Sequence, residues 1–319
     1  MVSLYPRLWQ IVMGFSLLLA LVGLLTANVS LPLYLAAILI LFVGIPHGAA
    51  DHRLFQKLYQ SVYGQRALLL FYLGYLGLMG AVFIGWYLLP VVTLLIFLLL
   101  SAYHFGQGNF AYLKARSWLH HAIYLLWGSW VIMTPVLWHF TEAQPVLESL
   151  LGFTLTPPAN LLLWLIPLGV LAITILLMCV VQPALKPQHF WRELISVAVL
   201  ALVFYFSPLF LGFAIYFALW HALPSALDQI RFLFQKENRG TARRYVLTAL
   251  PFSAMAIIGI VAIAIVQPDL DLSAYWSWLF AFVAALTLPH MLLLDRVYER
   301  LAHENQFHKE KELKRGNGI

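Results

Sequence analysis

The sequence predicts an all-α fold, a polytopic transmembrane bundle of about ten helices. The 319 residues are 62% hydrophobic and only 10% charged, with a mean hydropathy of +0.85, whereas soluble domains carry about 25% charged residues. Ten apolar segments are present, most of them about the 17–25 residues that cross ~30 Å of hydrocarbon. The basic residues fall only in alternate connections between these segments, as expected for loops on one side of a membrane.

The ten segments are separated by polar connections or by turn residues. The seventh segment is short and meets the eighth at Ser207-Pro208. Gly and Pro occur inside the segments, which a membrane helix tolerates when neighbouring helices satisfy the freed backbone groups. The segments lie near residues 8–26, 31–48, 67–88, 90–112, 118–138, 158–182, 192–206, 208–230, 245–267 and 274–295.

The charge distribution predicts the orientation of the chain. All 19 Lys and Arg residues lie on one side: Arg7 before the first segment, and the rest in the stretches 49–66, 113–117, 183–192 and 231–244 and in the tail after residue 295. The only charged residues in the opposite connections are acidic: Glu142, Glu148, Asp269 and Asp271. We therefore expect both termini in the cytoplasm of a multi-pass protein of the inner (plasma) membrane. The net charge of +6 is then a topology signal and a surface for anionic membrane lipid, not for nucleic acid.

We expect a single transmembrane domain over residues 1–298, followed by a charged cytoplasmic tail over 299–319. The one cysteine, Cys179, excludes an internal disulfide and is expected to be buried within a span.

Four of the eleven histidines, His47, His104, His221 and His290, lie within apolar segments that run from the outer to the inner side. They precede the next basic residue by 6, 10, 10 and 6 positions, which places them within about 6 Å of one depth at 1.5 Å rise per residue. A buried polar group in hydrocarbon is costly and normally marks a site. Neutral imidazoles at one level predict a metal site or a proton network, and imidazole suits Fe, Zn, Cu and Ni alike.

Polar and aromatic residues near these histidines are candidates for supporting roles. Asp51 follows His47 by one helical turn and is a candidate acceptor that orients a ligating ring, while His52 and Gln107 are weaker candidates. An aromatic group at the same level would suit a long apolar substrate entering from the bilayer, or simply packs the helices. Its members are Tyr103, Phe105, Trp127, Tyr216, Phe217 and Trp220.

Four short motifs resemble the signature segments of the Brp/Blh family of β-carotene 15,15′-dioxygenases. They are "PHGAADH" (46–52), "YHFG" (103–106), "WHALPS" (220–225) and "LPHMLLLD" (288–295). The resemblance implies an integral-membrane enzyme that uses non-haem Fe(II) and O₂ to split β-carotene, or a related carotenoid, into retinal. It implies His47, His104 and His221 as iron ligands, with His290 in the C-terminal Pro-His segment. Retinal as the product also suggests a functional link to a retinal-binding opsin.

The chain departs from the family pattern at Ser225, where the family often has a second histidine four residues after the one that matches His221. Ser225 is a poor iron ligand, so we assign it to the surroundings of the site. The neutral "HFGQGN" is a smaller departure, because an acidic residue is expected after the glycine. The alternatives are a divergent or inactive histidine-cluster protein, a proton-coupled transporter, or a haem- or metal-binding protein.

Overall fold

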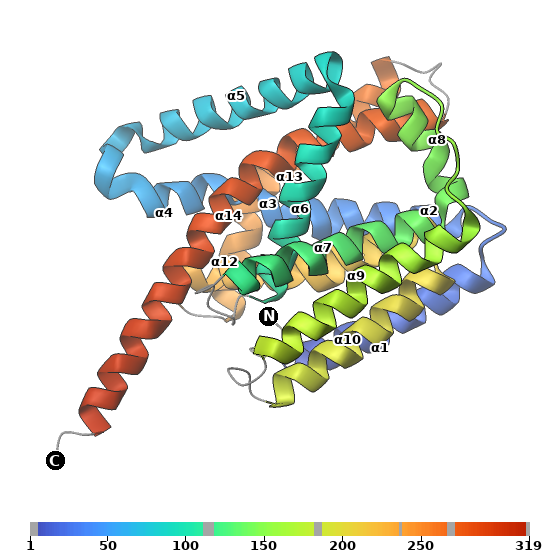
Figure 1. Ribbon diagram of the computed structural model, residues 1–319. Helices are drawn as coiled ribbons and strands as arrows, with labels where there is room; N and C mark the ends of the chain where they lie inside the picture. Colours follow the sequence, from blue (N-terminus) through green and yellow to red (C-terminus); the bar gives the residue numbers. More distant parts are fainter. Residues whose placement is uncertain (1–5, 111–117, 182–186, 236–237, 267–271, 317–319) are drawn as a thin grey trace.

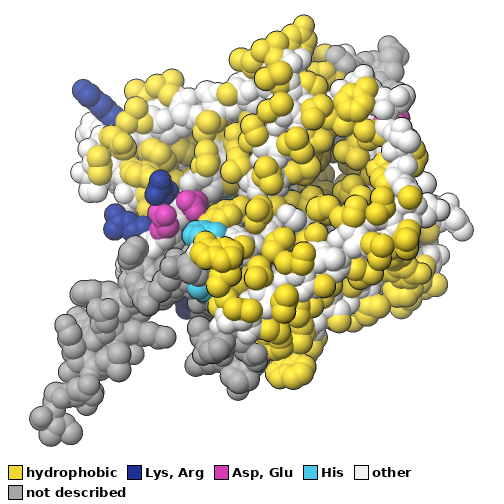
Figure 2. Space-filling model, viewed as in Figure 1, with side chains coloured by type: hydrophobic (Ala, Val, Ile, Leu, Met, Phe, Trp, Pro, Cys, Tyr) yellow, Lys and Arg dark blue, Asp and Glu magenta, His cyan; other side chains and the backbone are white. Residues whose placement is uncertain are grey.

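The computed structural model of the chain describes residues 6–110, 118–181, 187–235, 238–266 and 272–316, and all its regular elements in these ranges are helices (Figure 1). Helices satisfy their own backbone hydrogen bonds, which is required where no water is available. Hydrophobic side chains cover much of the visible surface, and the visible Lys and Arg side chains lie at the left of the view (Figure 2). The predicted all-α fold is confirmed. The predicted connection 113–117 and the part 183–186 of the predicted connection 183–192 lie outside the described residues, as do Asp269 and Asp271.

The elements follow one another as helices broken by short π or 3₁₀ segments. The first half of the chain contains α1 (Pro6–Leu25), α2 (Leu31–Leu39), η1 (Ile40–Gly44), α3 (Ile45–Gly48), α4 (Asp51–Tyr63), η2 (Gly64–Arg66), α5 (Ala67–Leu88), α6 (Pro90–Asn109) and α7 (Trp118–Trp138). The second half contains α8 (Phe140–Leu151), α9 (Asn160–Val181), α10 (Pro187–Phe206), α11 (Leu209–Ile215), η4 (Tyr216–Ala222), α12 (Leu223–Phe234), α13 (Arg239–Val266) and α14 (Leu272–Gly316).

Eight helical segments of the described chain are long and apolar enough to cross a membrane, so the chain is a multi-pass membrane protein. The count differs from the ten predicted segments at two places. Leu31–Leu88 counts as one helical segment although it contains two predicted ones, and α10, which holds the predicted segment 192–206, is not among the eight.

Two of the expected connections contain helices. The basic stretch 49–66 contains α4, whose apolar face buries Leu54 and Leu58, and the stretch after α7 contains α8. At the C-terminal end, α14 continues as one helix of 45 residues through the tail and extends beyond the rest of the molecule (Figure 1). Cys179 is exposed on α9, so its expected burial was wrong.

Two glycines allow α6 and α7 to touch backbone to backbone. A Cβ atom added at Gly106 would lie 1.9 Å from the carbonyl oxygen of Tyr124, and one added at Gly128 would lie 1.8 Å from that of Ala102. Small residues permit such close approach between membrane helices. This contact fixes the part of α6 that carries His104, two residues from Gly106.

Replacing Gly106 by alanine tests this contact. Because the new methyl group would meet backbone atoms, which cannot rotate away, we expect Gly106→Ala to cost about 3 kcal/mol or more of stability. The control is Gly77→Ala on α5, where nothing lies within 4 Å, and which should be neutral or stabilise by up to about 1 kcal/mol. Thermal unfolding of the purified proteins in detergent measures both. Equal effects of the two substitutions would contradict the close contact.

His139, just before α8, joins the start of that helix to the end of α10 and, through Glu142, to the start of α11. Its Nδ1 lies 3.2 Å from a carboxylate oxygen of Glu142, and its Nε2 lies 2.7 Å from the carbonyl oxygen of Phe204. The other oxygen of Glu142 accepts a 3.0 Å hydrogen bond from the Leu209 amide. Both nitrogens of His139 face acceptors, so this arrangement favours the imidazolium form.

The His139–Glu142 pair predicts a pH dependence of stability. Burial acts to lower the pKa of His139, but the hydrogen bonds to Glu142 and Phe204 outweigh it and raise the pKa above 6.5. Stability from the charged ring is then fully present below pH 6.5 and is lost as the pH rises through the folded-state pKa. The free energy of unfolding lost in His139→Gln should be about 1 kcal/mol or less, because the pair is partly exposed. This loss of stability, measured from denaturation curves, should become smaller as the pH rises. A loss that grows with pH would contradict the presence of a charged His139.

Candidate metal centre

The structure brings the four membrane-embedded histidines together. They come from α3, α6, η4 and α14, and each side chain is buried. Each ring lies near two others in a closed set, with planes 74–88° apart. The centroid distances are 4.7 Å for His47–His290, 5.3 Å for His47–His221, 4.9 Å for His104–His221 and 5.8 Å for His104–His290. Four segments far apart in the sequence thus contribute to one cluster.

Prolines and π-helical turns shape three of these four segments. The amide of Ile45 bonds to the carbonyl of Ile40, and that of Leu223 to the carbonyl of Ala218, both one residue further back than in an α-helix. Each wide turn ends just before a proline, Pro46 or Pro224, which has no amide hydrogen to donate. Such turns are frequent at functional sites because they re-aim a side chain.

The carbonyl oxygen of His47 is held by two side chains from other helices. The helical segment breaks between α3 and α4, so this carbonyl does not continue the ladder. It accepts hydrogen bonds from Gln229 Nε2 at 2.8 Å and from the Tyr245 hydroxyl at 3.1 Å. The Tyr245 hydroxyl also lies 2.9 Å from Gln229 Oε1. This buried network fixes the backbone of His47 from α12 and α13.

Hydrogen bonds define the orientation of two of the rings. His47 Nδ1 donates to the carbonyl oxygen of Gly44, and His290 Nδ1 donates to both oxygens of Asp51 at 2.9 and 3.0 Å. These bonds leave the Nε2 lone pairs of both rings unused. Those two Nε2 atoms and both nitrogens of His104 are among the buried side-chain atoms of the described residues that have no hydrogen-bond partner.

The spacing of the four rings is compatible with one shared metal ion. An imidazole–metal bond is about 2.1 Å long, so two rings that share one ion have centroids about 4.5–6.5 Å apart, a range that includes all four measured distances. Within the described residues, however, no group of three or more His, Cys, Asp or Glu side chains is already arranged to hold a metal ion. The rings are therefore close enough to share an ion, but would have to turn to aim their nitrogens at it.

The residues predicted to support the site divide into two groups. Asp51 contacts a ring of the cluster, although the ring is that of His290 and not of His47 on its own segment. Ser225 is fully buried and its hydroxyl lies 3.4 Å from Gln229 Nε2, so it joins the network behind His47. His52 and Gln107 contact other residues instead. The ring centroids of His52 and Phe252 are 4.6 Å apart, and the side-chain amide of Gln107 donates a 2.6 Å hydrogen bond to Asp295.

The predicted aromatic group also divides by distance from the histidines. The ring centroid of Phe105 lies 4.7 Å from that of His221, and the ring centroid of Phe217 lies 5.6 Å from that of His47. Tyr216 packs on Phe105. The other three make contacts away from the cluster.

Those three aromatic residues have their own partners. Tyr103 pairs with His121 Nδ1 at 2.8 Å, Trp127 packs against Phe110 and Trp130, and the indole of Trp220 donates to Ser16.

Sequence reasoning missed three polar residues that serve the cluster from neighbouring helices. Gln229 and Tyr245 hold His47, and the Tyr75 hydroxyl donates to the Leu286 carbonyl at 2.8 Å and lies within hydrogen-bonding reach of Asp51. Gln229 follows His221 by two helical turns and could have been noticed as a polar residue on the same face. No sequence pattern distinguishes Tyr75 or Tyr245 from the other tyrosines.

Fold and site together define a multi-pass helical membrane protein with a buried histidine cluster. The profile of the family described as "Beta-carotene 15,15'-dioxygenase" matches residues 38–298, which include all four histidines. The chain therefore belongs to the β-carotene 15,15′-dioxygenase family, a family of oxidoreductases.

Two curated relatives agree with this assignment. The "Beta-carotene 15,15'-dioxygenase" of an uncultured marine bacterium, 66A03, is 26% identical over 267 residues, covering 82% of this chain and 93% of that protein. The "Probable beta-carotene 15,15'-dioxygenase Blh" of Halobacterium salinarum is 24% identical over 284 residues, covering 80% and 81%. No solved structure matches the chain significantly.

Proposed function

We propose that this protein is a non-haem iron dioxygenase that cleaves the central 15,15′ double bond of β-carotene, or of a related carotenoid, to give retinal. The observation that carries the proposal is the closed set of four buried histidine rings, three of which have buried nitrogens without a hydrogen-bond partner, in a chain of this family. A retinal-binding opsin is the proposed consumer of the product.

The proposed Fe(II) ligands are His47, His104, His221 and His290. Non-haem Fe(II) with open coordination positions supplies the activation of O₂. The protein keeps the imidazoles neutral, because four cations this close together and removed from water would be prohibitively costly. Gly44 and Asp51 each accept the Nδ1 hydrogen of one ring. The Nε2 atom of that ring is then unprotonated, and its lone pair is available to the metal ion.

His290 is proposed as the fourth ligand in place of a residue at position 225. Its ring closes the set between His47 and His104, and its hydrogen bond to Asp51 is the arrangement usual for a ligating histidine. Ser225 contacts Gln229 instead. The serine therefore contributes to the support of His47 and leaves the ligand set at four.

The proposed carotenoid-binding residues are the aromatic group named above, with Phe105, Phe217 and Tyr216 nearest the reacting double bond and Tyr103, Trp127 and Trp220 further away. Their apolar faces suit a hydrocarbon polyene. Rings packed around the histidines also exclude water from the place where O₂ reacts. Because the substrate dissolves in lipid, entry from the bilayer requires no aqueous channel.

The topology belongs to the same proposal. Ten spans across the inner membrane, with both termini on the cytoplasmic side, place all basic connections on that side. Residues 299–319 then extend into the cytoplasm as a charged tail.

Retinal production in cells tests the function. We expect a bacterial host that accumulates β-carotene to bleach and to yield retinal on expression of the chain, and His47→Ala or His290→Ala to reduce retinal at least 100-fold. The control, His139→Gln, replaces a histidine outside the cluster and should retain activity. Chromatography of the extracts measures substrate and product.

Three outcomes would contradict the proposal. If apocarotenals other than retinal accumulate, cleavage occurs away from the central bond. If the cells stay coloured although the purified protein binds iron and is folded, the chain is a divergent binding protein or acts on another substrate. A Soret absorption band would indicate haem in place of non-haem iron.

Asp51→Asn tests the ligand set without relying on activity. An asparagine cannot accept the His290 Nδ1 hydrogen as strongly as a carboxylate, so we expect the affinity for Fe(II) to fall about 10- to 100-fold. The control is Asp295→Asn on the same helix as His290, because Asp295 pairs with Gln107. Metal titration of the purified proteins under anaerobic conditions gives both affinities. Equal losses in the two variants would exclude a specific role for Asp51.

A further inference from the structure

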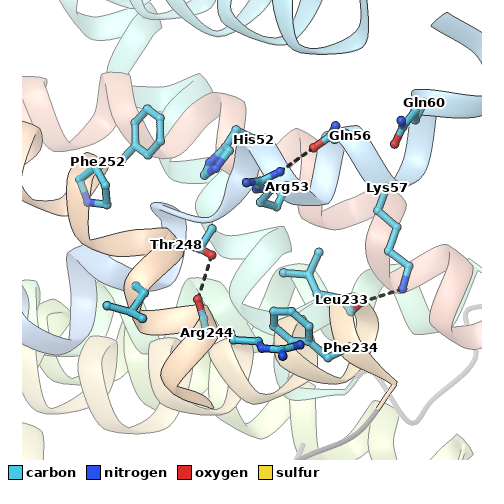
Figure 3. A pocket seen from close by; sticks show the side chains of 12 residues that line it. His52, Arg53, Gln56, Lys57, Gln60, Leu233, Phe234, Arg244, Thr248 and Phe252 are labelled. Atoms are coloured by element: carbon cyan, nitrogen blue, oxygen red, sulfur yellow. Dashed lines mark hydrogen bonds between the residues drawn. The ribbon is translucent and has the colours of Figure 1, made fainter. Parts of the chain in front are cut away.

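A cleft on the basic side of the protein lies apart from the histidine cluster. It has a volume of about 730 Å³ and is open to the outside, which is within the range of about 300–1,000 Å³ typical of small-molecule sites. In Figure 3, α4 forms one wall, while the end of α12 and the start of α13 form the other. Its lining includes His52, Gln56, Gln60 and Thr248.

The charge of the cleft is entirely basic. Arg53 and Lys57 line it from α4 and Arg244 lines it from α13, and none of the described residues in the lining is acidic. Lys57 is held by the carbonyl oxygens of Phe232 and Leu233, whereas Arg53 donates a hydrogen bond to the neutral side chain of Gln56. Figure 3 shows Arg53 and Arg244 on facing walls. Guanidinium groups from two walls of one cleft suit a phosphate group, which each can bind through paired hydrogen bonds.

The cleft becomes apolar along α13. Leu247, Pro251 and Phe252 line it beyond Arg244, and Phe252 lies about 12 Å further along the helix axis at 1.5 Å per residue. A cationic end followed by an apolar wall matches the profile of a phospholipid, whose phosphate joins an acyl-bearing glycerol, better than that of a free phosphate ion.

We propose that this cleft binds the phosphate-containing headgroup of an anionic phospholipid from the leaflet on the basic side of the membrane. Arg53 and Arg244 hold the phosphate, Thr248 and Gln56 offer polar contacts, and the wall from Leu247 to Phe252 receives the start of the acyl chains. Basic pockets between membrane helices bind such headgroups elsewhere. The inference is independent of the cleavage reaction, and the proposed topology supplies only the name of the leaflet, the cytoplasmic one.

A bound headgroup would join α4 to α13. The first residue of α4 is Asp51, which orients His290, and α13 carries Tyr245, which holds His47. The lipid therefore braces the two helices that support the cluster from the aqueous side. Its expected effect is on the stability of the folded protein.

Thermal unfolding in mixed micelles tests the proposal with the full-length protein. We expect phosphatidylglycerol to raise the Tm by about 4 °C or more over phosphatidylcholine. Arg53→Gln/Arg244→Gln should lose at least half of this shift, while Arg53→Lys/Arg244→Lys should keep most of it. The control is Arg66→Gln/Arg300→Gln, which removes the same charge outside the cleft and should keep the full shift. Retention of phosphatidylglycerol in native mass spectrometry should follow the same order.

The other outcomes overturn the proposal. If inorganic phosphate or glycerol 3-phosphate gives the same shift, the ligand is a water-soluble phosphate and not a lipid. If the control double variant loses the shift equally, the effect is the general attraction of a basic surface. The Tm of each variant in phosphatidylcholine shows whether that variant is folded. If the glutamine variant is misfolded, the lysine variant tests the proposal: it supports lipid binding if it keeps the shift and contradicts it if the shift is lost.

Discussion

The structure depends on one constraint, the cost of an unsatisfied backbone group in a membrane. Pro46, Pro224 and Pro289 each remove a backbone donor from a helix next to a histidine of the cluster. Neighbouring helices satisfy other backbone groups near these positions: Gln229 and Tyr245 reach the carbonyl of His47, where α3 ends, and Tyr75 reaches that of Leu286. The distortions that re-aim the histidines are therefore tolerated only because side chains from other helices satisfy the backbone nearby.

Much of the fold and the main elements of the site could be predicted from the sequence because hydrocarbon leaves few options. Long apolar segments can only be helices, and a shared depth for His47, His104, His221 and His290 predicted that they meet. The pairing of Asp51 with His290 could not be predicted, because helical spacing relates Asp51 only to its own segment. Amphipathic α4 was hidden for a similar reason: a polar connection between spans can be a loop or a helix lying at the interface.

The departure at Ser225 has a structural explanation. A histidine four residues after His221 would project from the same helical face, but here that position faces Gln229 and is fully buried. The small side chain leaves room for the amide that holds His47. His290, from a helix distant in sequence, completes the set of four rings instead. Ser225 thus belongs to the network that supports the backbone of His47, where a histidine would have placed a second imidazole on the helix of His221.

The length of α14 has a mechanical consequence. Its 45 residues form a rod of about 68 Å, more than twice the hydrocarbon thickness of ~30 Å. His290 lies one residue past Pro289, on the part of α14 that continues into the tail. This part packs in one apolar cluster with residues of α4, α5 and α12, through Leu293, Leu294, Val297 and Tyr298. A load that tilts the tail is therefore passed to these helices as well as to the ring of His290.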